Sequence, residues 1–361
     1  MECSLKLIYQ LLPSMNPPEF QRRILEWFDL QGRKDLPWQQ NITPYRVWLS
    51  ETMLQQTQVS TVIPYYNTFI KHYPSIEILA QAPIDDVLHH WSGLGYYARA
   101  RNLHKTAQII AEQDFFPDTL DELINLPGIG LSTAGAILSI AFKKSHPILD
   151  GNVKRVLARF KAISGWPGHS LVNKQLWSIS AELTPEYRVA EYTQAMMDLG
   201  ATVCTRSKPK CCQCPIQTAC LAKQSEAISV LPTPKPPKTL PVKQLVLLLL
   251  SNETGQIFLE KRPPTGIWGG LWSLPEFNSI ELVYDWCQSN IQPITEMQIL
   301  ASQRHTFSHY HLDYTTVLVK AENPINFVME ANQTVWYKLE QLKKLGVPAP
   351  IKLLLQQYAR G

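Results

Sequence analysis

Residues 119–142 have the sequence TLDELINLPGIGLSTAGAILSIAF, which predicts two short helices joined by a tight turn. Apolar residues recur at helical spacing in Thr119–Asn125 and again in Leu131–Phe142, and a proline and two glycines separate the two patterns. Gly128 and Gly130 permit a turn with positive φ, whose amides point outward at the start of the second helix. Such a turn can bind a DNA phosphate, and its carbonyl oxygens could hold a monovalent cation. An ordinary connection between two helices remains an alternative on these residues alone.

Further helices are expected on both sides of this turn. Residues Pro44–Gln58 have apolar side chains three to seven positions apart, and Val153, Leu157 and Phe160 form another apolar stripe. Small residues at 134–136 predict close packing between the two helices of the hairpin. Because no strong alternating pattern precedes the linker described next, residues 15–225 are predicted to form an all-α domain.

A change of composition predicts a second domain. Residues 226–241 contain five prolines and little apolar periodicity, which is typical of a semi-rigid linker. Residues 242–361 are predicted to form an α+β domain. The expected strands of this domain are Gln244–Ser251, Gln256–Lys261 and Tyr310–Ala321. The expected helices are Ile280–Ser289 and Ile351–Arg360.

The charge of the chain is unevenly distributed. The formal net charge is +4, but residues 90–225 alone carry 15 Lys and Arg against 10 Asp and Glu. This excess suits a surface that faces a polyanion, although a solvated basic face explains it equally well. No apolar run reaches the roughly 18 residues of a membrane span, so no membrane partner is expected. A cytoplasmic location and a monomeric state are the default expectations.

Four of the seven cysteines form a spaced cluster. Cys204, Cys211, Cys214 and Cys220 follow the pattern C-x6-C-x2-C-x5-C, and Cys212 lies inside the loop. An odd number of cysteines without a secretion signal argues against a disulfide framework. On spacing alone, zinc and an iron–sulfur cluster are equally suitable, and Cys212 could exchange roles with Cys211. The basic residues within the loop are suited to gripping phosphate; they are Arg206, Lys208 and Lys210.

Two carboxylates are candidates for acid–base chemistry. Asp150 precedes a predicted helix, where it would act as the N-cap and retain its charge beside the helix amides. Glu51 is expected on a helix face shared with Val47 and Leu54, where burial would raise its pKa and suit it as a general acid. A surface glutamate is the alternative. A protonated acid together with an ionised one is the arrangement that cleaves a glycosidic bond through an oxocarbenium-like state.

Together these motifs resemble the endonuclease III superfamily of DNA repair glycosylases. The resemblance lies in the hairpin LPGIG, the aspartate about twenty residues later in ILDGNVKRVL at 148–157, and the cysteine loop. Three segments resemble the MutY family in particular: WLSETMLQQTQV at 48–59, GLGYYARARNLHK at 93–105 and CTRSKPKCCQCP at 204–215. The resemblance runs from about Pro18 to the C-terminus.

The resemblance implies an activity and a set of site residues. It implies excision of adenine mispaired with 8-oxoguanine or guanine from double-stranded DNA, with Glu51 as the acid and base and Asp150 stabilising the sugar cation. It also implies a [4Fe–4S] cluster on Cys204, Cys211, Cys214 and Cys220. The residues expected around the extruded adenine or on the DNA are Leu36, Trp38, Gln55, Tyr96, Gly128, Gly130, Ser132, Asn152, Lys154 and Gln194.

Ser132 bears on the outcome of the reaction. In the endonuclease III branch this position is a lysine that attacks the sugar and leads to strand scission. Serine cannot form a Schiff base, so a monofunctional glycosylase with little or no lyase activity is expected.

The second domain resembles the Nudix-like domain of the MutY family. Gly270 and Glu276 satisfy the first two positions of the Nudix metal-binding box, but the expected acidic segment does not follow, so pyrophosphohydrolase activity is not expected. The resemblance instead implies recognition of 8-oxoguanine through Phe307, Ser308 and His309. An aromatic ring, a hydroxyl and an imidazole could stack and hydrogen-bond beside the lesion, although ordinary turn chemistry is the alternative.

Overall fold

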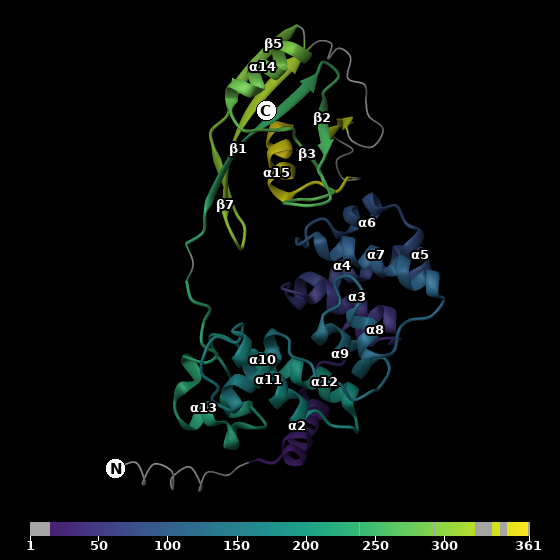
Figure 1. Ribbon diagram of the computed structural model, residues 1–361, viewed down its shortest axis with the longest axis vertical. Coiled ribbons are helices and arrows are strands. Elements are labelled where there is room, and N and C mark those ends of the chain that lie inside the picture. The colour runs from purple at the N-terminus through teal and green to yellow at the C-terminus, as the bar shows by residue number, and fades with distance from the viewer. Residues whose placement is uncertain (1–14, 238, 292, 322–333, 340–344, 360–361) are drawn as a thin grey trace. The chain divides into compact units, whose positions relative to one another are not determined.

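The computed structural model describes residues 15–359, apart from residues 238, 292, 322–333 and 340–344 (Figure 1). The chain divides into two compact units. The first unit contains the chain up to Ile70 together with Lys105–Pro237, and the second contains Lys71–His104 together with the chain from Lys238 onward. The break at residue 237 falls within the proline-rich segment. The predicted domain boundaries stay a prediction.

Helices make up the regular structure of the first unit, and its described residues include no strand, as predicted. Several helices begin at residues suited to capping: the side chains of Asn16 and Thr43 accept hydrogen bonds from the backbone amides of Glu19 and Arg46. The α-helices of this unit are α2 (Pro17–Gln31), α3 (Pro44–Leu54), α4 (Val59–His72), α7 (Ala98–Gln113), α8 (Leu120–Ile124), α9 (Leu131–Ile140), α10 (Gly151–Phe160), α11 (Ser170–Leu183), α12 (Val189–Asp198) and α13 (Leu221–Gln224), of which α4 and α7 continue into the second unit.

Helix α10 lies at the centre of a buried core in this unit. The predicted stripe Val153, Leu157 and Phe160 is buried, and the ring of Phe160 lies 4.8 Å from that of Phe20 on α2. A π-helical turn at Leu199–Val203 follows α12 and contacts α10. Short 3-10 turns occur at η1 (Pro37–Gln39), η3 (Cys211–Gln213), η4 (Gln217–Ala219) and η5 (Ala227–Ser229).

The hairpin between α8 and α9 differs in detail from the expectation. Gly128 has the expected positive φ of +80°, but Gly130 is extended and forms the N-cap of α9 at φ −96°. Only the first glycine therefore needs a conformation that other residues avoid. Helices α8 and α9 are in contact, and Gly135 also permits a second close approach, because a Cβ there would lie 2.3 Å from the carbonyl oxygen of Pro147. This second close approach is between α9 and the segment that leads to Asp150.

The second unit contains a mixed sheet in the order β3-β2-β1-β7-β5, with β4 and β6 paired to β1 and β7, and β8 paired to β2. Its elements are α5 (Ile76–Gln81), α6 (Ile84–Trp91), β1 (Val242–Asn252), β2 (Gln256–Lys261), β3 (Trp272–Ser273), β4 (Glu276–Phe277), α14 (Ile280–Asn290), β5 (Ile294–Ile299), β6 (Gln303–Thr306), β7 (His311–Ala321), β8 (Thr334–Lys338) and α15 (Ala349–Tyr358). The predicted α+β class is confirmed. The last residue of the predicted helix Ile351–Arg360 lies outside the described residues.

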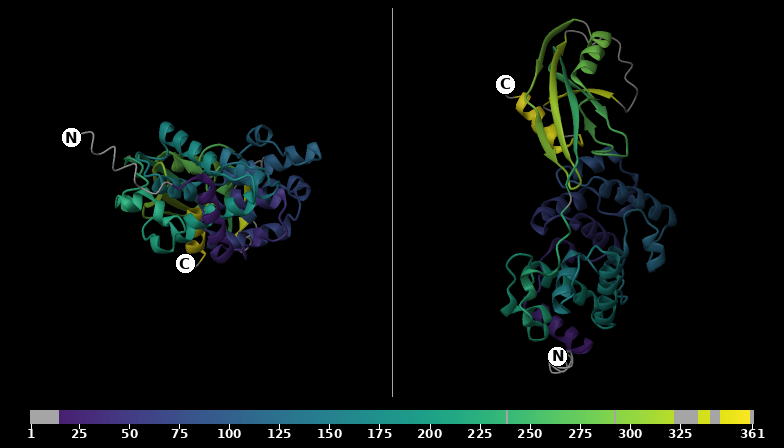
Figure 2. Two further views of the ribbon diagram at one scale, coloured as in Figure 1. Left: turned by 90° about the horizontal axis from the view of Figure 1, so that it is seen from below. Right: turned by 60° about the vertical axis from the view of Figure 1, so that its left-hand side comes forward.

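Strands β1 and β7 form the centre of this sheet. They pair in parallel over eleven residues, from Val242 opposite His311 to Asn252 opposite Ala321. Helices α14 and α15 cover opposite faces of the sheet (Figure 2). Because both faces are covered, residues 246–251 of β1 are buried without alternation.

We expect Gly135→Ala to destabilise the first unit by about 1–3 kcal/mol, because the new methyl group would force α9 away from the Pro147 carbonyl. Urea denaturation of the full chain measures the loss. Gly151→Ala is the matched control, since a Cβ there meets no atom within 4 Å. Equal stability of the two variants would contradict the close approach.

Candidate active site

A cavity of about 800 Å³ in the first unit collects most of the residues predicted around the extruded base. Both candidate carboxylates contribute to its wall. The predicted residues that line it are Leu36, Trp38, Glu51, Gln55, Ser132, Asp150, Asn152 and Gln194. Segments more than 150 positions apart in the sequence therefore meet at one concave surface, the form expected of a ligand site.

Glu51 lies on α3, where its neighbours Trp48, Leu49 and Met53 are buried. The side chain is partly exposed and lines the cavity. Burial of the carboxyl group, together with the negative charge of Asp150, raises the pKa of Glu51 to about 8. The group is therefore protonated at neutral pH, which suits a general acid.

Asp150 is the N-cap of α10, as predicted. Its carboxylate accepts hydrogen bonds from the backbone amide of Val153 at 2.8 Å and from the side-chain amide of Asn152 at 3.0 Å. The positive end of the helix dipole lies at the same place. These interactions stabilise a negative charge in the cavity, close enough to Glu51 to oppose its ionisation.

The segment leading to Asp150 is held by serine hydroxyl groups. Ser132 accepts a hydrogen bond from the Leu149 amide at 3.0 Å, and Ser180 donates to the Ile148 carbonyl at 2.7 Å. Ser132 thus contributes to the cavity wall and also fixes the backbone next to the aspartate.

The cavity is lined by both apolar and polar side chains. Leu36 and Trp38 are each 6% exposed, and Trp38 packs edge-on against Tyr66 at 5.5 Å. On the polar side, the amide of Gln194 donates to the carboxylate of Asp198, which is almost fully buried and paired with Arg33. Arg33 and Asp198 were not singled out from the sequence. Neither lies in a recognisable motif, and only the fold brings Arg33 to Asp198, which lies 165 positions later in the sequence.

The end of α3 presents two glutamines to the cavity. Gln55 forms the C-cap of the helix, and Gln56 has a left-handed φ of +56° and is exposed. Both residues line the cavity. Sequence reasoning named only Gln55, because the departure of Gln56 from the helix was not visible in the periodic pattern, which predicted a helix continuing to Gln58.

Other predicted DNA contacts lie outside this cavity. Gly128 and Gly130 form the hairpin turn, and Lys154 follows Asp150 on the first turn of α10. Tyr96 belongs to the second unit, where it is 49% exposed at a positive φ of +50°. The guanidinium group of Arg99 lies 5.5 Å from its ring. An exposed fraction of this size shows that Tyr96 is not part of the hydrophobic core.

The four spaced cysteines line one small cavity of about 20 Å³. Cys211, and not Cys212, contributes to this cavity, and Cys212 is exposed. Burial, with a smaller contribution from neighbouring cysteine sulfurs, raises the pKa of Cys214 to about 12 and also raises that of Cys220. Within the described part of the chain, no three His, Cys, Asp or Glu side chains form a group suited to a single metal ion. Among these residues the cysteines are free thiols.

Two arginines of α10 join the cysteine loop to the rest of the unit. Arg155 donates to the carbonyl oxygens of Cys204 and Gly200, each at 2.6 Å. Arg159, which is 2% exposed, donates to the Cys204 sulfur at 3.4 Å and to the Thr205 carbonyl at 2.7 Å. No local pattern predicts these contacts, because each joins residues at least 45 positions apart in the sequence.

The second unit has its own cavity, of about 1080 Å³, which includes Phe307, Ser308 and His309. These residues form the turn between β6 and β7, closed by a hydrogen bond from the Phe307 amide to the Tyr310 carbonyl at 2.9 Å. Ser308 and His309 are exposed, and Phe307 is partly buried. The predicted lesion-recognition residues are therefore presented together at one cavity.

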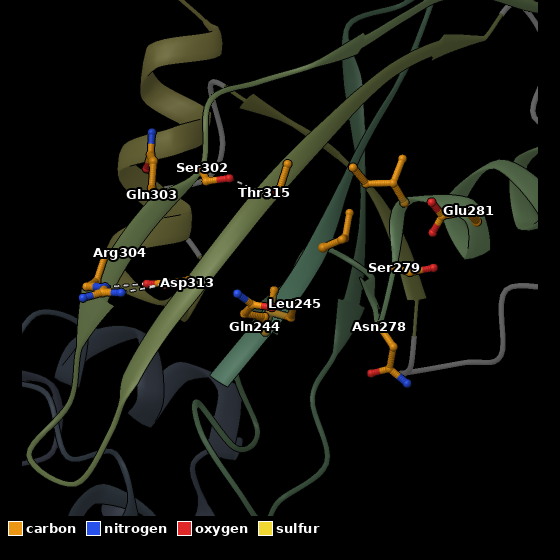
Figure 3. Close-up of a pocket in the computed structure, with 12 residues that line it drawn as sticks. Gln244, Leu245, Asn278, Ser279, Glu281, Ser302, Gln303, Arg304, Asp313 and Thr315 are labelled. Carbon is orange, nitrogen blue, oxygen red and sulfur yellow. Dashed lines mark hydrogen bonds and ion pairs between the residues drawn. The ribbon is translucent and has the colours of Figure 1, made fainter. Parts of the chain in front are cut away.

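A separate polar groove of about 540 Å³ lies along β1, β6 and β7 beside the start of α14 (Figure 3). An ion pair between Arg304 and Asp313 and a hydrogen bond between Ser302 and Thr315 cross it. None of the predicted site residues lines this groove.

Among the helices of the described residues, none is both long and apolar enough to cross a membrane.

Two family models match the chain. The model of the HhH-GPD superfamily base excision DNA repair proteins matches residues 49–182, and that of the NUDIX domain matches residues 246–357. The first range contains both candidate carboxylates, and the second contains the turn at Phe307–His309.

The chain is similar to curated proteins over nearly its whole length. It is 40% identical to an adenine DNA glycosylase of Buchnera aphidicola from Acyrthosiphon pisum, over 95% of this chain and 98% of that protein. It is 32% identical to the human adenine DNA glycosylase, over 94% of this chain and 74% of the human protein. Among solved structures, a thermostable thymine-DNA glycosylase matches 58% of this chain and 97% of its own, with 26% identity and a TM-score of 0.51.

We expect Glu51→Gln to stabilise the protein increasingly as the pH rises from 5 to 8.5. The folded state keeps a proton on Glu51 up to a pKa of about 8, whereas the unfolded state releases it near the ordinary value of 4.5, so stability is lost across this interval. The substitution removes that loss, and about 2 kcal/mol or more should be gained at pH 8.5.

Urea denaturation at both pH values measures this gain. Glu26→Gln is the control, because Glu26 is an exposed residue of α2 and its substitution should show no such dependence on pH. A gain for Glu51→Gln that is the same at both pH values would contradict the raised pKa.

Proposed function

This chain belongs to the adenine DNA glycosylase family, and from that premise we propose that it removes adenine mispaired with 8-oxoguanine or guanine from double-stranded DNA. As a member of the family it is a base excision repair enzyme, a hydrolase that acts on N-glycosyl bonds. The observation that carries the proposal is that one cavity holds both Glu51, whose pKa burial raises, and Asp150, whose carboxylate accepts a hydrogen bond from the Val153 amide.

Glu51 is the general acid in this proposal. Its proton passes to adenine at N7, so that the base leaves as a neutral molecule when the bond to the sugar breaks. The carboxylate that remains then accepts a proton from the attacking water, which restores the acid for the next turnover. A pKa of about 8 keeps the proton available at neutral pH. Leu36 and Trp38 supply the apolar wall of the base pocket, and Asn152 and Gln194 its polar wall.

Asp150 stabilises the sugar cation that forms when adenine leaves. The two hydrogen bonds from Val153 and Asn152 orient the carboxylate before the reaction, so little reorganisation is needed as positive charge develops. The hydroxyl of Ser132 accepts a hydrogen bond from the Leu149 amide, and serine has no amine that could form a Schiff base. The proposed reaction therefore ends at an abasic site with the strand intact.

The four cysteines are proposed as ligands of a [4Fe–4S] cluster. Four thiols around one small cavity suit thiolate ligation, because metal binding replaces the protons that burial of Cys214 and Cys220 otherwise retains. Cys204, Cys211, Cys214 and Cys220 would hold the group, which would supply rigidity to the loop carrying Arg206, Lys208 and Lys210. A monovalent cation at the hairpin turn, the monomeric state and the cytoplasmic location remain predictions.

The turn at Phe307–His309 is proposed to recognise the base opposite the adenine. Exposed hydrogen-bonding groups on Ser308 and His309, with the ring of Phe307 behind them, suit contact with 8-oxoguanine. Tyr96 and Gln55 are the proposed residues that enter the DNA stack when adenine is flipped out.

We expect single-turnover reactions on duplexes with adenine opposite 8-oxoguanine to give strand breaks only after alkali treatment. Asp150→Asn should lose at least about a hundredfold in rate, because it removes the charge that stabilises the sugar cation. Duplex affinity measured alongside should be retained. Breaks without alkali would contradict the monofunctional reaction, and an undiminished rate would contradict the role of Asp150.

The rate of this reaction should fall as the pH rises above about 8, since deprotonation of Glu51 removes the acid. Single-turnover rates between pH 6 and pH 9.5 measure the profile. A rate that stays constant to pH 9.5 would show that Glu51 is not the acid.

A further inference from the structure

We propose that Trp268 is a positioning residue for the turn at Phe307–His309, and that it thereby determines the preference for 8-oxoguanine over guanine. The inference rests on the proposed function of that turn and deepens it, because it names what holds the turn in place. Trp268 lies forty residues earlier in the chain and carries no role in the reaction itself.

The backbone of Trp268 adopts an unusual conformation. Its φ is +54°, a left-handed value that is an outlier for a bulky residue and carries a strain energy. Such a conformation persists only where the surroundings determine it, and it often marks a functional position. The side chain is 8% exposed and lines the same cavity as the turn.

A closed loop between β2 and β3 imposes this conformation. The Leu271 amide donates to the Trp268 carbonyl at 3.0 Å, and the Arg262 amide donates to the Leu271 carbonyl at 2.9 Å. The Arg262 side chain donates to the Ile267 carbonyl at 2.8 Å and forms an ion pair with Glu276 on β4. The guanidinium carbon lies 5.8 Å from the Trp268 ring. The position of the indole is therefore fixed both by the backbone hydrogen bond of Trp268 and by the contact with Arg262.

The indole contacts the base of the turn. Its ring centre lies 5.7 Å from that of Phe307 and 6.2 Å from that of His305. These two rings meet edge to face at 4.6 Å, and Phe307 also packs on Tyr310 at 4.8 Å. Aromatic pairs at these separations stabilise one another beyond the effect of their buried area.

These contacts explain how a distant residue could affect recognition. Ser308 and His309 are exposed at a short turn, so the backbone conformation of Phe307 determines where their polar groups point. A turn that is ordered before DNA binds loses less conformational entropy on binding. Hydrogen bonds that distinguish 8-oxoguanine from guanine require such ordering, because they depend on the positions of single atoms.

Trp268→Gly in the full chain is the test variant. Glycine adopts a φ of +54° without strain, so the substitution removes the ring while leaving the loop conformation accessible. We expect the ratio of single-turnover rates for adenine opposite 8-oxoguanine and opposite guanine to fall about tenfold, which corresponds to about 1.4 kcal/mol. Trp268→Phe, which keeps an aromatic ring, should recover part of the ratio.

Hydrogen exchange of the DNA-free protein supplies a second measurement. The Phe307 amide, bonded to the Tyr310 carbonyl, should exchange faster in Trp268→Gly than in the parent. The control is Trp336→Leu, which alters a tryptophan packed on Phe258 in the core beneath α14. That variant should keep both the parental rate ratio and the parental exchange of Phe307.

The outcomes separate the two proposals. A folded Trp268→Gly protein with parental exchange at Phe307 would overturn the positioning role, whatever the parent recognises. A parent protein without preference for 8-oxoguanine would refute lesion recognition, while faster exchange in the variant would still establish the positioning of the turn. Faster exchange with an unchanged rate ratio would overturn the role in specificity.

Discussion

The hydrogen bonds of Arg155 tie together the parts of the first unit on which the site depends. The side chain extends from α10, whose N-cap is Asp150, to the carbonyl oxygens of Gly200 and Cys204. It also donates to the side-chain oxygen of Asn152, whose amide in turn holds Asp150. The cysteine loop, the π-helical turn and the candidate catalytic carboxylate are therefore linked through one helix. A change in the conformation of the cysteine loop would therefore affect Asp150 through the hydrogen bonds of Arg155 and Asn152.

The two carboxylates of the cavity differ because their surroundings differ. Asp150 lies at the start of a helix, where amides and the helix dipole favour its negative charge. Glu51 lies within a helix whose neighbouring side chains are buried, so loss of water raises its pKa. The charge on the first also helps to keep the proton on the second. This division between an ionised and a protonated group is what cleavage of a glycosidic bond requires.

The second unit holds a short polar turn, Phe307–His309, in a fixed position. The parallel pairing of β1 and β7 gives a sheet buried on both faces, and the turn at Phe307–His309 leads into β7. Packing by Trp268, itself held by Arg262, supports the turn from a neighbouring loop. The exposed groups thus rest on a rigid base, although they lie at the surface.

Much of this protein could be predicted from local sequence. Some features depend on residues only a few positions apart, and periodicity and turn-forming residues therefore predict them. They are the hairpin, the cap at Asp150, the cysteine spacing and the strands around residue 252. The raised pKa of Glu51 followed from its helix face, but its size required the burial that only the fold creates. Three contacts join residues 39 to 165 positions apart in sequence: the pairing of Arg33 with Asp198, the hydrogen bond of Arg155 to Cys204, and the packing of Trp268 on Phe307. No local pattern records such contacts, because they depend on the path of the whole chain, and the tertiary structure alone decided them.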